Sequence, residues 1–263
     1  MDLKIKNKVA LITASSSGLG KAVALRLSKE GAKVMICSRS EKNILKAKTE
    51  IEAKTQGIVR AFITDVTDDN QVSEMINIIV NEFGGIDILI CNAGGPPSGR
   101  AIDFKVNDYR KAVELNLIST INLSYKVLDF MKKQKWGRII NITSVSAKQP
   151  IENLILSNTA RAGVLGFAKS LSSQVASYGI TVNSVCPGFT KTQRVENIAK
   201  AFVESGQGTQ EDFYNNLEAT VPMKRIGTTD EFAQTVGFLA SEGAGYITGV
   251  ALQIDGGWVK GLF

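Results

Sequence analysis

The chain has 263 residues, of which 44% are hydrophobic and 21% are charged, and its formal net charge at neutral pH is +6. A chain of this size can bury one large core, so we expect a single domain spanning residues 1–263. No apolar run approaches the ~18 residues of a membrane span. Residues 1–8 lead directly into a strand without a signal peptide, so we expect a cytoplasmic protein that has no membrane partner.

Three features of the composition narrow the chemistry. The sequence contains no histidine, which removes the commonest general base and most zinc sites, and we expect no metal. Its three cysteines, Cys37, Cys91 and Cys186, form no CxxC pair and indicate reduced thiols buried at strand ends. The lysines are scattered and interleave with acidic residues, which is typical of solvated helix faces, so we expect no nucleic-acid partner.

Predicted strands and helices alternate along the chain. Short apolar runs indicate strands at 9–13, 33–38, 58–63, 86–91, 137–142, 180–186 and 251–254. Helical periodicity indicates helices that begin near residue 18 and then cover 41–54, 68–83, 106–133, 151–177 and 229–241, whereas the polar stretch after residue 188 is expected to be irregular up to residue 222. This alternation predicts an α/β fold of the Rossmann type, a single-domain, doubly wound parallel sheet of about seven strands with helices on both faces.

A turn of small residues follows the first predicted strand. It contains Ser15, Ser16, Ser17, Gly18, Leu19 and Gly20, and a helix follows at once. Small side chains let the backbone approach a pyrophosphate, and a helix N-terminus offers free N–H groups and the positive end of the helix dipole. Taken alone, this turn is equally typical of a strand-to-helix connection that binds nothing.

Further motifs lie where other strands end. Asp65-Val66 closes the third strand, Cys91-Asn92-Ala93-Gly94 closes the fourth, Ser144 follows the fifth, Pro187-Gly188-Phe189-Thr190-Lys191-Thr192 follows the sixth, and Asp255-Gly256-Gly257 follows the last. Asn116 lies inside the long helix before the fifth strand. Open α/β sheets bind ligands outside the carboxyl ends of their strands, so these motifs point to one shared site.

In this order and spacing the motifs resemble the short-chain dehydrogenase/reductase family over residues 6–257, and most of all its acyl-carrier-protein and small-carbonyl reductases. The resemblance implies an enzyme that interconverts a small-molecule carbonyl and an alcohol, and that forms a homotetramer or homodimer. It implies that the first turn holds the cofactor phosphates and ribose. The remaining implied contacts are Asp65 and Val66 at the adenine, Asn92, Ala93 and Gly94 at the ribose and nicotinamide, and Pro187, Gly188, Thr190 and Thr192 at the carboxamide.

Ala14 stands where the family usually has glycine. Alanine is the smallest residue with a Cβ atom, so we expect only a modest effect, provided that φ is negative at this position. A second implied feature is a substrate lid at 190–222. Its apolar residues Phe202, Phe213 and Leu217 would make one wall of the pocket partly apolar.

The end of the second strand indicates which cofactor is used. NAD enzymes place a carboxylate here to bind the ribose 2′-hydroxyl, but this end reads Cys37-Ser38-Arg39-Ser40 and contains no acid. Arg39, beside Ser38, offers a forked cation suited to a 2′-phosphate. The sequence therefore predicts NADP(H) rather than NAD(H), with an ordinary surface arginine as the alternative.

The catalytic centre departs from the family pattern. In the family, a Ser and a Tyr hydroxyl contact the substrate oxygen, and a Lys four residues after the Tyr lowers its pKa and relays protons through an Asn. Asn116 and Ser144 match this pattern, but Ser157 and Arg161 occupy the Tyr and Lys positions. Ser157 and Arg161 still share one helix face because they are four residues apart.

The altered pair changes the proton chemistry. A serine hydroxyl is a far weaker acid than a phenol, and arginine, with a pKa above ~12, can stabilise an oxyanion but cannot relay protons. General acid–base catalysis, worth about 10²–10⁴-fold, is therefore the contribution at risk. Lys148 and Tyr214 are candidate substitutes, although a solvated lysine and a packed tyrosine are the simpler interpretations.

We predict an NADP(H)-dependent oxidoreductase with an altered proton-donor centre formed by Asn116, Ser144, Ser157 and Arg161. Two alternatives remain open. One is a dinucleotide-binding protein without redox turnover, serving as a sensor or an inactive subunit. The other is a non-redox reaction, such as a lyase or isomerase step, on the same site.

Overall fold

The computed structural model describes residues 2–262, and residues 1 and 263, the outer ends of the expected domain, lie outside this range. Its strands are β1 (Val9–Ile12), β2 (Lys33–Ser38), β3 (Val59–Ile63), β4 (Ile88–Cys91), β5 (Gly137–Ile142), β6 (Ile180–Pro187) and β7 (Ala251–Ile254). Its helices are α1 (Gly18–Lys29), α2 (Glu41–Thr55), α3 (Asp69–Phe83), α4 (Val106–Val113), α5 (Ser119–Gln134), α6 (Ile155–Val175), α7 (Gln193–Glu204), α8 (Gln210–Thr220) and α9 (Thr229–Leu239).

Within the described range, the strands form one seven-stranded sheet in the order β3-β2-β1-β4-β5-β6-β7. Every neighbouring pair is parallel, and the register places Leu11 of β1 opposite both Met35 of β2 and Leu89 of β4. The strand order reverses at β1, as it does in doubly wound sheets. The predicted fold class is therefore confirmed.

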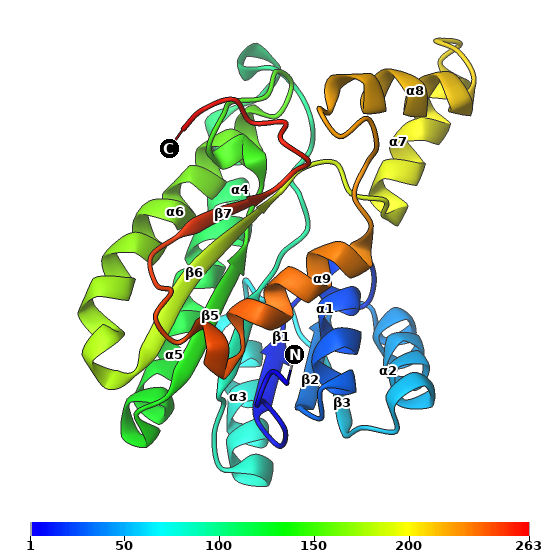
Figure 1. Ribbon diagram of the computed structural model, residues 1–263. Helices are drawn as coiled ribbons and strands as arrows, with labels where there is room; N and C mark the ends of the chain where they lie inside the picture. Colours follow the sequence, from blue (N-terminus) through cyan, green and yellow to red (C-terminus); the bar gives the residue numbers. More distant parts are fainter. Residues whose placement is uncertain (1, 263) are drawn as a thin grey trace.

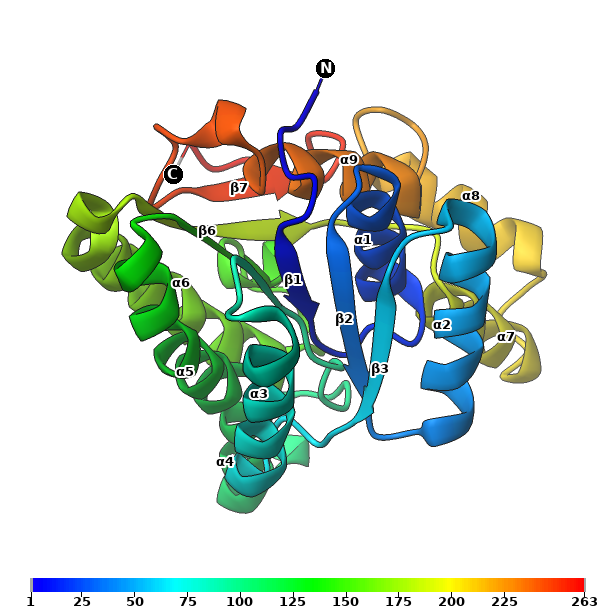
Figure 2. The ribbon, with the colours of Figure 1, turned by 90° about the horizontal axis from the view of Figure 1, so that it is seen from below.

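Two hydrophobic cores cover the two faces of this sheet. Successive strand residues point to opposite faces, and accordingly Ala10 and Ile12 lie in one core whereas Val9 and Leu11 lie in the other. The first core contains apolar residues of α1, α2 and α9, and the second contains those of α3, α5 and α6. Figure 2 shows the two groups of helices on opposite sides of the strands. The sheet is consequently buried on both faces, which explains its nearly uninterrupted apolar strands.

The segment after β6 differs from its expectation. It was expected to be irregular up to residue 222, but it forms α7 and α8, which lie beyond the carboxyl ends of the strands at the upper right of Figure 1. Thr209 caps α8, because its Oγ1 accepts from the Asp212 N–H at 3.1 Å while its own N–H donates to the Asp212 carboxylate at 2.8 Å. The Phe202 and Phe213 rings, 5.6 Å apart, join the two helices.

Two long predicted helices also have different boundaries. The helix expected from residue 151 begins at Ile155, because Asn153 has a left-handed φ of +61° that helical geometry excludes. The helix expected over 106–133 is interrupted by a π-helical segment at Glu114–Ile118. This segment contains Asn116, and π-turns inside helices frequently mark functional sites.

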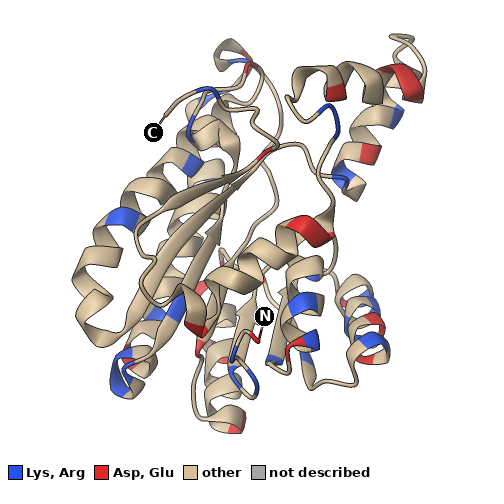
Figure 3. Cartoon of the chain, viewed as in Figure 1, with Lys and Arg blue, Asp and Glu red and all other residues tan. Residues whose placement is uncertain are grey.

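Surface charge and thiols follow the sequence predictions. In Figure 3, Lys and Arg are spread over many elements and interleave with Asp and Glu on α2. All three cysteines are buried and free, and burial raises the pKa of both Cys37 and Cys91 to about 12. No helix among residues 2–262 is long and apolar enough to cross a membrane, and in that range no cluster of potential ligands for a metal ion is present.

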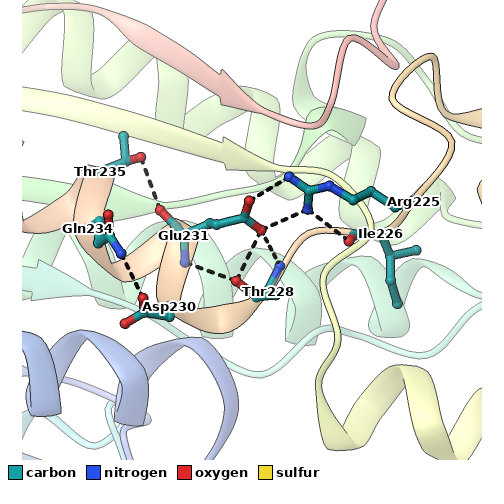
Figure 4. A network of polar contacts seen from close by, with 7 residues as sticks. All are labelled: Arg225, Ile226, Thr228, Asp230, Glu231, Gln234 and Thr235. Atoms are coloured by element: carbon teal, nitrogen blue, oxygen red, sulfur yellow. Dashed lines mark hydrogen bonds and ion pairs between the residues drawn. The ribbon is translucent and has the colours of Figure 1, made fainter.

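A polar network fixes the chain where it leaves α8 and enters α9 (Figure 4). The Arg225 guanidinium donates to both carboxylate oxygens of Glu231, at 2.9 and 2.6 Å. The same carboxylate accepts from the N–H of Thr228 at 2.8 Å and from its hydroxyl at 3.0 Å, and so caps α9. The bidentate ion pair therefore ties the end of the α7–α8 segment to a helix that packs on the sheet.

The network predicts an acid-dependent loss of stability. The hydrogen bond from Arg225, followed by those from Thr228, lowers the pKa of Glu231 from 4.5 to about 2. A lowered carboxyl pKa stabilises the fold above its unfolded value, and this stabilisation is lost as the pH falls towards the folded value. The variant Glu231→Gln should therefore have a lower Tm than the native protein at pH 7, and the two Tm values should converge between pH 4.5 and about 2.

Thermal unfolding of both proteins across this pH range measures the difference. The variant Glu41→Gln, which removes an acid from the first turn of α2, is a matched control and should show a smaller effect. A Tm difference that persists unchanged at pH 2.5 would contradict the role given to the Glu231 carboxylate.

Candidate active site

A cavity of about 600 Å³ opens at the carboxyl ends of the strands, above the point where the strand order reverses. It brings together most of the residues predicted from the sequence. Those that line it are Ser16, Ser17, Gly18, Leu19, Ser38, Arg39, Asp65, Val66, Asn92, Ala93, Gly94, Arg161 and Thr192. The predicted residues that are not in its lining are Ser15, Gly20, Asn116, Ser144, Ser157, Pro187, Gly188 and Thr190.

The turn after β1 presents an open helix N-terminus to the cavity. Ser17 precedes α1 in an extended conformation, and its side chain makes no capping hydrogen bond. The first N–H groups of a helix have no partner within the helix. Gly18 and Leu19 therefore expose N–H donors and the positive end of the α1 dipole to the cavity.

The modest effect expected for Ala14 depended on a negative φ, and this condition is not met because its φ is +44°. The chain turns sharply here between the end of β1 and the start of α1, and the Ala14 carbonyl accepts from the Asn92 side chain at 3.1 Å. A left-handed conformation costs a non-glycine residue about 1–2 kcal/mol. The turn therefore holds local strain that a glycine would not have.

Three predicted residues shape this turn, and two of them, Ser15 and Gly20, do not line the cavity. Ser15 is fully buried, and its hydroxyl donates to the Ile12 carbonyl at 2.7 Å and accepts from the Cys37 N–H at 3.1 Å. Gly20 fits closely, since a Cβ atom there would lie 2.7 Å from the Ala14 carbonyl oxygen. Asn92 both lines the cavity and supports the turn through its bond to Ala14.

Arg39 and Asp65 face each other at one end of the cavity. An Arg39 guanidinium nitrogen lies 3.9 Å from an Asp65 carboxylate oxygen, and the Arg39 side chain is 74% exposed. Burial opposes ionisation of Asp65, but hydrogen bonds from Thr67 and the charge of Arg39 outweigh it and lower the pKa of this carboxyl. Arg39 is thus free to move towards an anion, since exposed ion pairs at this distance are worth little.

Ser157 and Arg161 share one face of α6 and are both buried, but their polar groups have different partners. The Ser157 hydroxyl hydrogen-bonds the Ser146 hydroxyl at 3.0 Å. The Arg161 Nη1 donates to the carbonyl oxygens of Ile142 at 3.0 Å and Thr143 at 2.8 Å, at the end of β5. Arg161 reaches the cavity wall, whereas Ser157 does not.

The guanidinium of Arg161 is unusually placed for a charged group. Arg161 as a residue is 8% exposed, and no acidic partner lies within ion-pair distance among residues 2–262. Burial, followed by the positive charge of Arg194, lowers the pKa of Arg161 from 12.5 to about 10. This is lower than the sequence alone suggested, yet the side chain stays charged near neutral pH.

Asn116 and Ser144 directly follow Leu115 and Thr143, which line the cavity, but are not in the lining themselves. Asn116 is buried in the π-helical segment, where its Nδ2 donates to the Ala112 carbonyl at 3.2 Å. Its Oδ1 is buried and has no hydrogen-bond partner among the described residues, which points to an absent water or ligand donor. Ser144 accepts from the Ser146 N–H at 3.1 Å and so caps a short 3₁₀ turn at Val145–Ala147.

The segment after β6 carries three predicted residues that act through backbone shape. Gly188 packs against Asp255, where a Cβ atom would lie 2.7 Å from the Asp255 Cβ. Thr190 is buried and pairs with Gly227 as an isolated parallel bridge. Together with Pro187 they direct the chain so that Thr192 reaches the cavity.

Two other outcomes concern residues outside the predicted set. Lys148 ends the 3₁₀ turn and Tyr214 packs edge-on against Phe213 with ring centroids 5.4 Å apart, and neither is in the lining of the cavity. Arg194, which sequence reasoning missed, does line it. The sequence indicated Arg194 only through its position two residues after Thr192. The helix α7, whose first turn contains Arg194, was not predicted.

Comparison with known proteins agrees with this geometry. A family model described as enoyl-(acyl carrier protein) reductase matches residues 13–259. The chain is 37% identical to the 3-oxoacyl-acyl-carrier-protein reductase FabG of Haemophilus influenzae, over 96% of this chain and 98% of that protein. The chain belongs to the short-chain dehydrogenase/reductase family.

Solved structures of other short-chain dehydrogenase/reductase proteins share the whole architecture. L-sorbose reductase from Gluconobacter frateurii, complexed with NADPH and L-sorbose, superposes with a TM-score of 0.96 at 30% identity and full coverage of both chains. An actinorhodin polyketide ketoreductase with NADPH gives a TM-score of 0.90 at 31% identity, covering 97% of this chain and 98% of that one. The relatives are oxidoreductases, and the chain is a short-chain dehydrogenase/reductase-type enzyme.

Strain at Ala14 gives a stability prediction. The variant Ala14→Gly removes the left-handed penalty but makes the unfolded chain more flexible, so the free energy of unfolding should rise by about 0.5–1 kcal/mol. Denaturant unfolding measures this change. The variant Ala22→Gly, inside α1, is the matched control and should lower the free energy of unfolding by about 0.5–1 kcal/mol. Loss of stability in both variants would show that Ala14 is unstrained.

Proposed function

We propose that the protein is an NADP(H)-dependent oxidoreductase that interconverts a carbonyl and an alcohol through an altered proton-donor centre. One observation carries this proposal. A single cavity joins the open N-terminus of α1, the Arg39 cation, the Asn92–Gly94 turn and the Arg161 guanidinium. The relatives crystallised with NADPH support the choice of cofactor.

The residues present fit such a cofactor. The free N–H groups of Gly18 and Leu19 suit the pyrophosphate, and Val66 and Asp65 stand where the adenosine half would lie. Arg39 is exposed and only loosely held by Asp65, so it suits a 2′-phosphate. Bound there, the cofactor would supply or accept the hydride.

The chain's own residues would manage the charge on the substrate oxygen. Arg161 is buried and held by two carbonyl groups, so it is a preorganised cation and can stabilise a developing alkoxide. It cannot give up its proton easily with a pKa of about 10. We therefore propose that proton delivery is slow or comes from water, and that Ser157 contributes little because its hydroxyl is turned towards Ser146.

That same orientation of Ser157 favours a second candidate, a dinucleotide-binding protein without redox turnover. In that case the cavity would hold the cofactor, and the hydrogen-bonded pair of Ser146 and Ser157 would have only a structural role.

Two further features belong to the first proposal. The α7–α8 pair would act as the lid at 190–222, because Thr192, which precedes α7, and Arg194 in its first turn line the cavity. Phe202 and Phe213 join the two helices. Self-association into dimers or tetramers is supported by exposed aromatic side chains, Tyr125 at 60% and Tyr178 at 43%, around a groove between α5 and the end of α6.

The cofactor is tested first. Fluorescence titration should show tighter binding of NADPH than of NADH, and Arg39→Ala should weaken NADPH binding about tenfold without changing NADH binding, because only NADPH carries the 2′-phosphate. Arg60→Ala, which removes a surface arginine paired with Glu82, is the control and should change neither. Equal binding of the two cofactors by the native protein would remove the proposed role of Arg39.

The altered donor is tested by restoring the family pair. The double variant Ser157→Tyr/Arg161→Lys should reduce a panel of aldehydes and ketones faster than the native protein, by about 10²–10⁴-fold in kcat, because a phenol can donate the proton. NADPH titration of the variant shows that its fold is retained. Native turnover as fast as that of the double variant would mean that the native centre has an efficient donor. Turnover by the double variant alone would favour the second candidate.

A further inference from the structure

Two arginines in the lining of the cavity have no acidic partner among the described residues. Arg161 and Arg194 both line it, and among residues 2–262 neither makes an ion pair. They are close enough for the charge of Arg194 to disfavour the charged form of Arg161. Two uncompensated cations that repel each other in a partly desolvated site favour an anion between them.

The protein itself satisfies little of their hydrogen-bonding capacity. Among the described residues, Arg161 donates hydrogen bonds from one nitrogen only, Nη1, to the carbonyl oxygens at the end of β5. Arg194 makes one long contact, 3.5 Å from Nη2 to the Pro96 carbonyl, and lies against the Gly95 backbone. A guanidinium presents five N–H donors, so both residues keep donors available for the cavity.

The phosphates of the proposed cofactor have other partners. The N-terminus of α1 suits the pyrophosphate, and Arg39 suits the 2′-phosphate at the opposite end of the cavity. Beyond the pyrophosphate, the nicotinamide ring and its ribose carry no further phosphate, and the oxidised ring is cationic. Asp65, the only carboxylate in the described lining, lies beside Arg39 and cannot balance the charge of the two arginines.

We propose that the substrate is anionic, with its carboxylate or phosphate oxygens bound by the guanidinium groups of both Arg194 and Arg161. This inference rests on the proposed function. Guanidinium groups bind such oxygens through paired, charge-assisted hydrogen bonds. Because Arg194 lies in the first turn of α7, the bound anion would also help to hold the α7–α8 pair against the Gly95 backbone. Arg194 is thereby a specificity residue that only an anionic substrate would engage.

The test compares charged and neutral members of matched probe pairs. Pyruvate and phenylpyruvate are paired with their methyl esters, and dihydroxyacetone phosphate is paired with dihydroxyacetone. Calorimetry measures the binding of each probe to the protein saturated with NADP⁺. The charged member of at least one pair should bind at least about tenfold more tightly, and the pair concerned distinguishes carboxylate from phosphate.

The variant Arg194→Gln should weaken binding of the charged probe about 10- to 100-fold and leave the neutral probe unchanged. Arg194→Lys should restore part of the loss, because the charge returns without the fork. Arg60→Ala is the matched control, since it removes a surface arginine that pairs with Glu82 and does not line the cavity, and it should keep the preference for the charged probe.

Three outcomes would overturn the inference. The charged and neutral probes bind equally, the preference survives in Arg194→Gln, or Arg194→Gln weakens NADPH binding instead, which would assign Arg194 to the cofactor phosphates. Failure of the underlying function has a different signature, because a native protein that binds no NADPH fails before any probe is added.

Discussion

The strands β1 and β4 are neighbours at the centre of the sheet, and the helices flanking them pack on opposite faces. Helices α1 and α2 cover one face, and α3 and α5 cover the other. The two turns therefore diverge at the carboxyl edge, and no crossover helix fills the gap. Thr13 fixes this point. Its buried hydroxyl accepts from the Asn92 N–H at 2.8 Å and lies 2.6 Å from the Asn92 carbonyl oxygen, to which it donates. These two hydrogen bonds join the ends of β1 and β4, directly before the Ser16–Leu19 and Ala93–Gly95 stretches of the cavity lining.

Arg161 is a buried cation at the end of β5, in the lining of the cavity. A buried cation is costly unless it is hydrogen-bonded, and here the free carbonyls at the end of β5 supply the bonds. The shorter reach and single ammonium group of a lysine would leave more freedom to turn towards a neighbouring hydroxyl. The arginine is instead held in place. Under the proposed function the centre would keep electrostatic stabilisation of the substrate oxygen, and the loss would fall on proton transfer.

Much of the fold and most of the cavity could be predicted from the sequence, because both depend on local signals. The β7 strand was predicted with its observed bounds, since a short apolar run ends at Asp255-Gly256-Gly257. The α7–α8 pair was missed because its helices are short and polar and depend on the contact between Phe202 and Phe213 across the pair. The left-handed φ of Ala14 and the position of Arg194 were missed for the same reason. Each is imposed by tertiary neighbours, Asn92 in one case and the Gly95 backbone in the other.

The chain's lack of histidine has a consequence for how the cavity responds to its surroundings. The ionisable side chains in the described lining are three arginines and Asp65, whose pKa is lowered, and the lowest arginine value resolved is about 10. The nearby thiols of Cys37 and Cys91 are held protonated by burial. Asp65 and Arg161 therefore both keep their charges between about pH 5 and 9. A change in rate across this range would not come from the titration of either side chain.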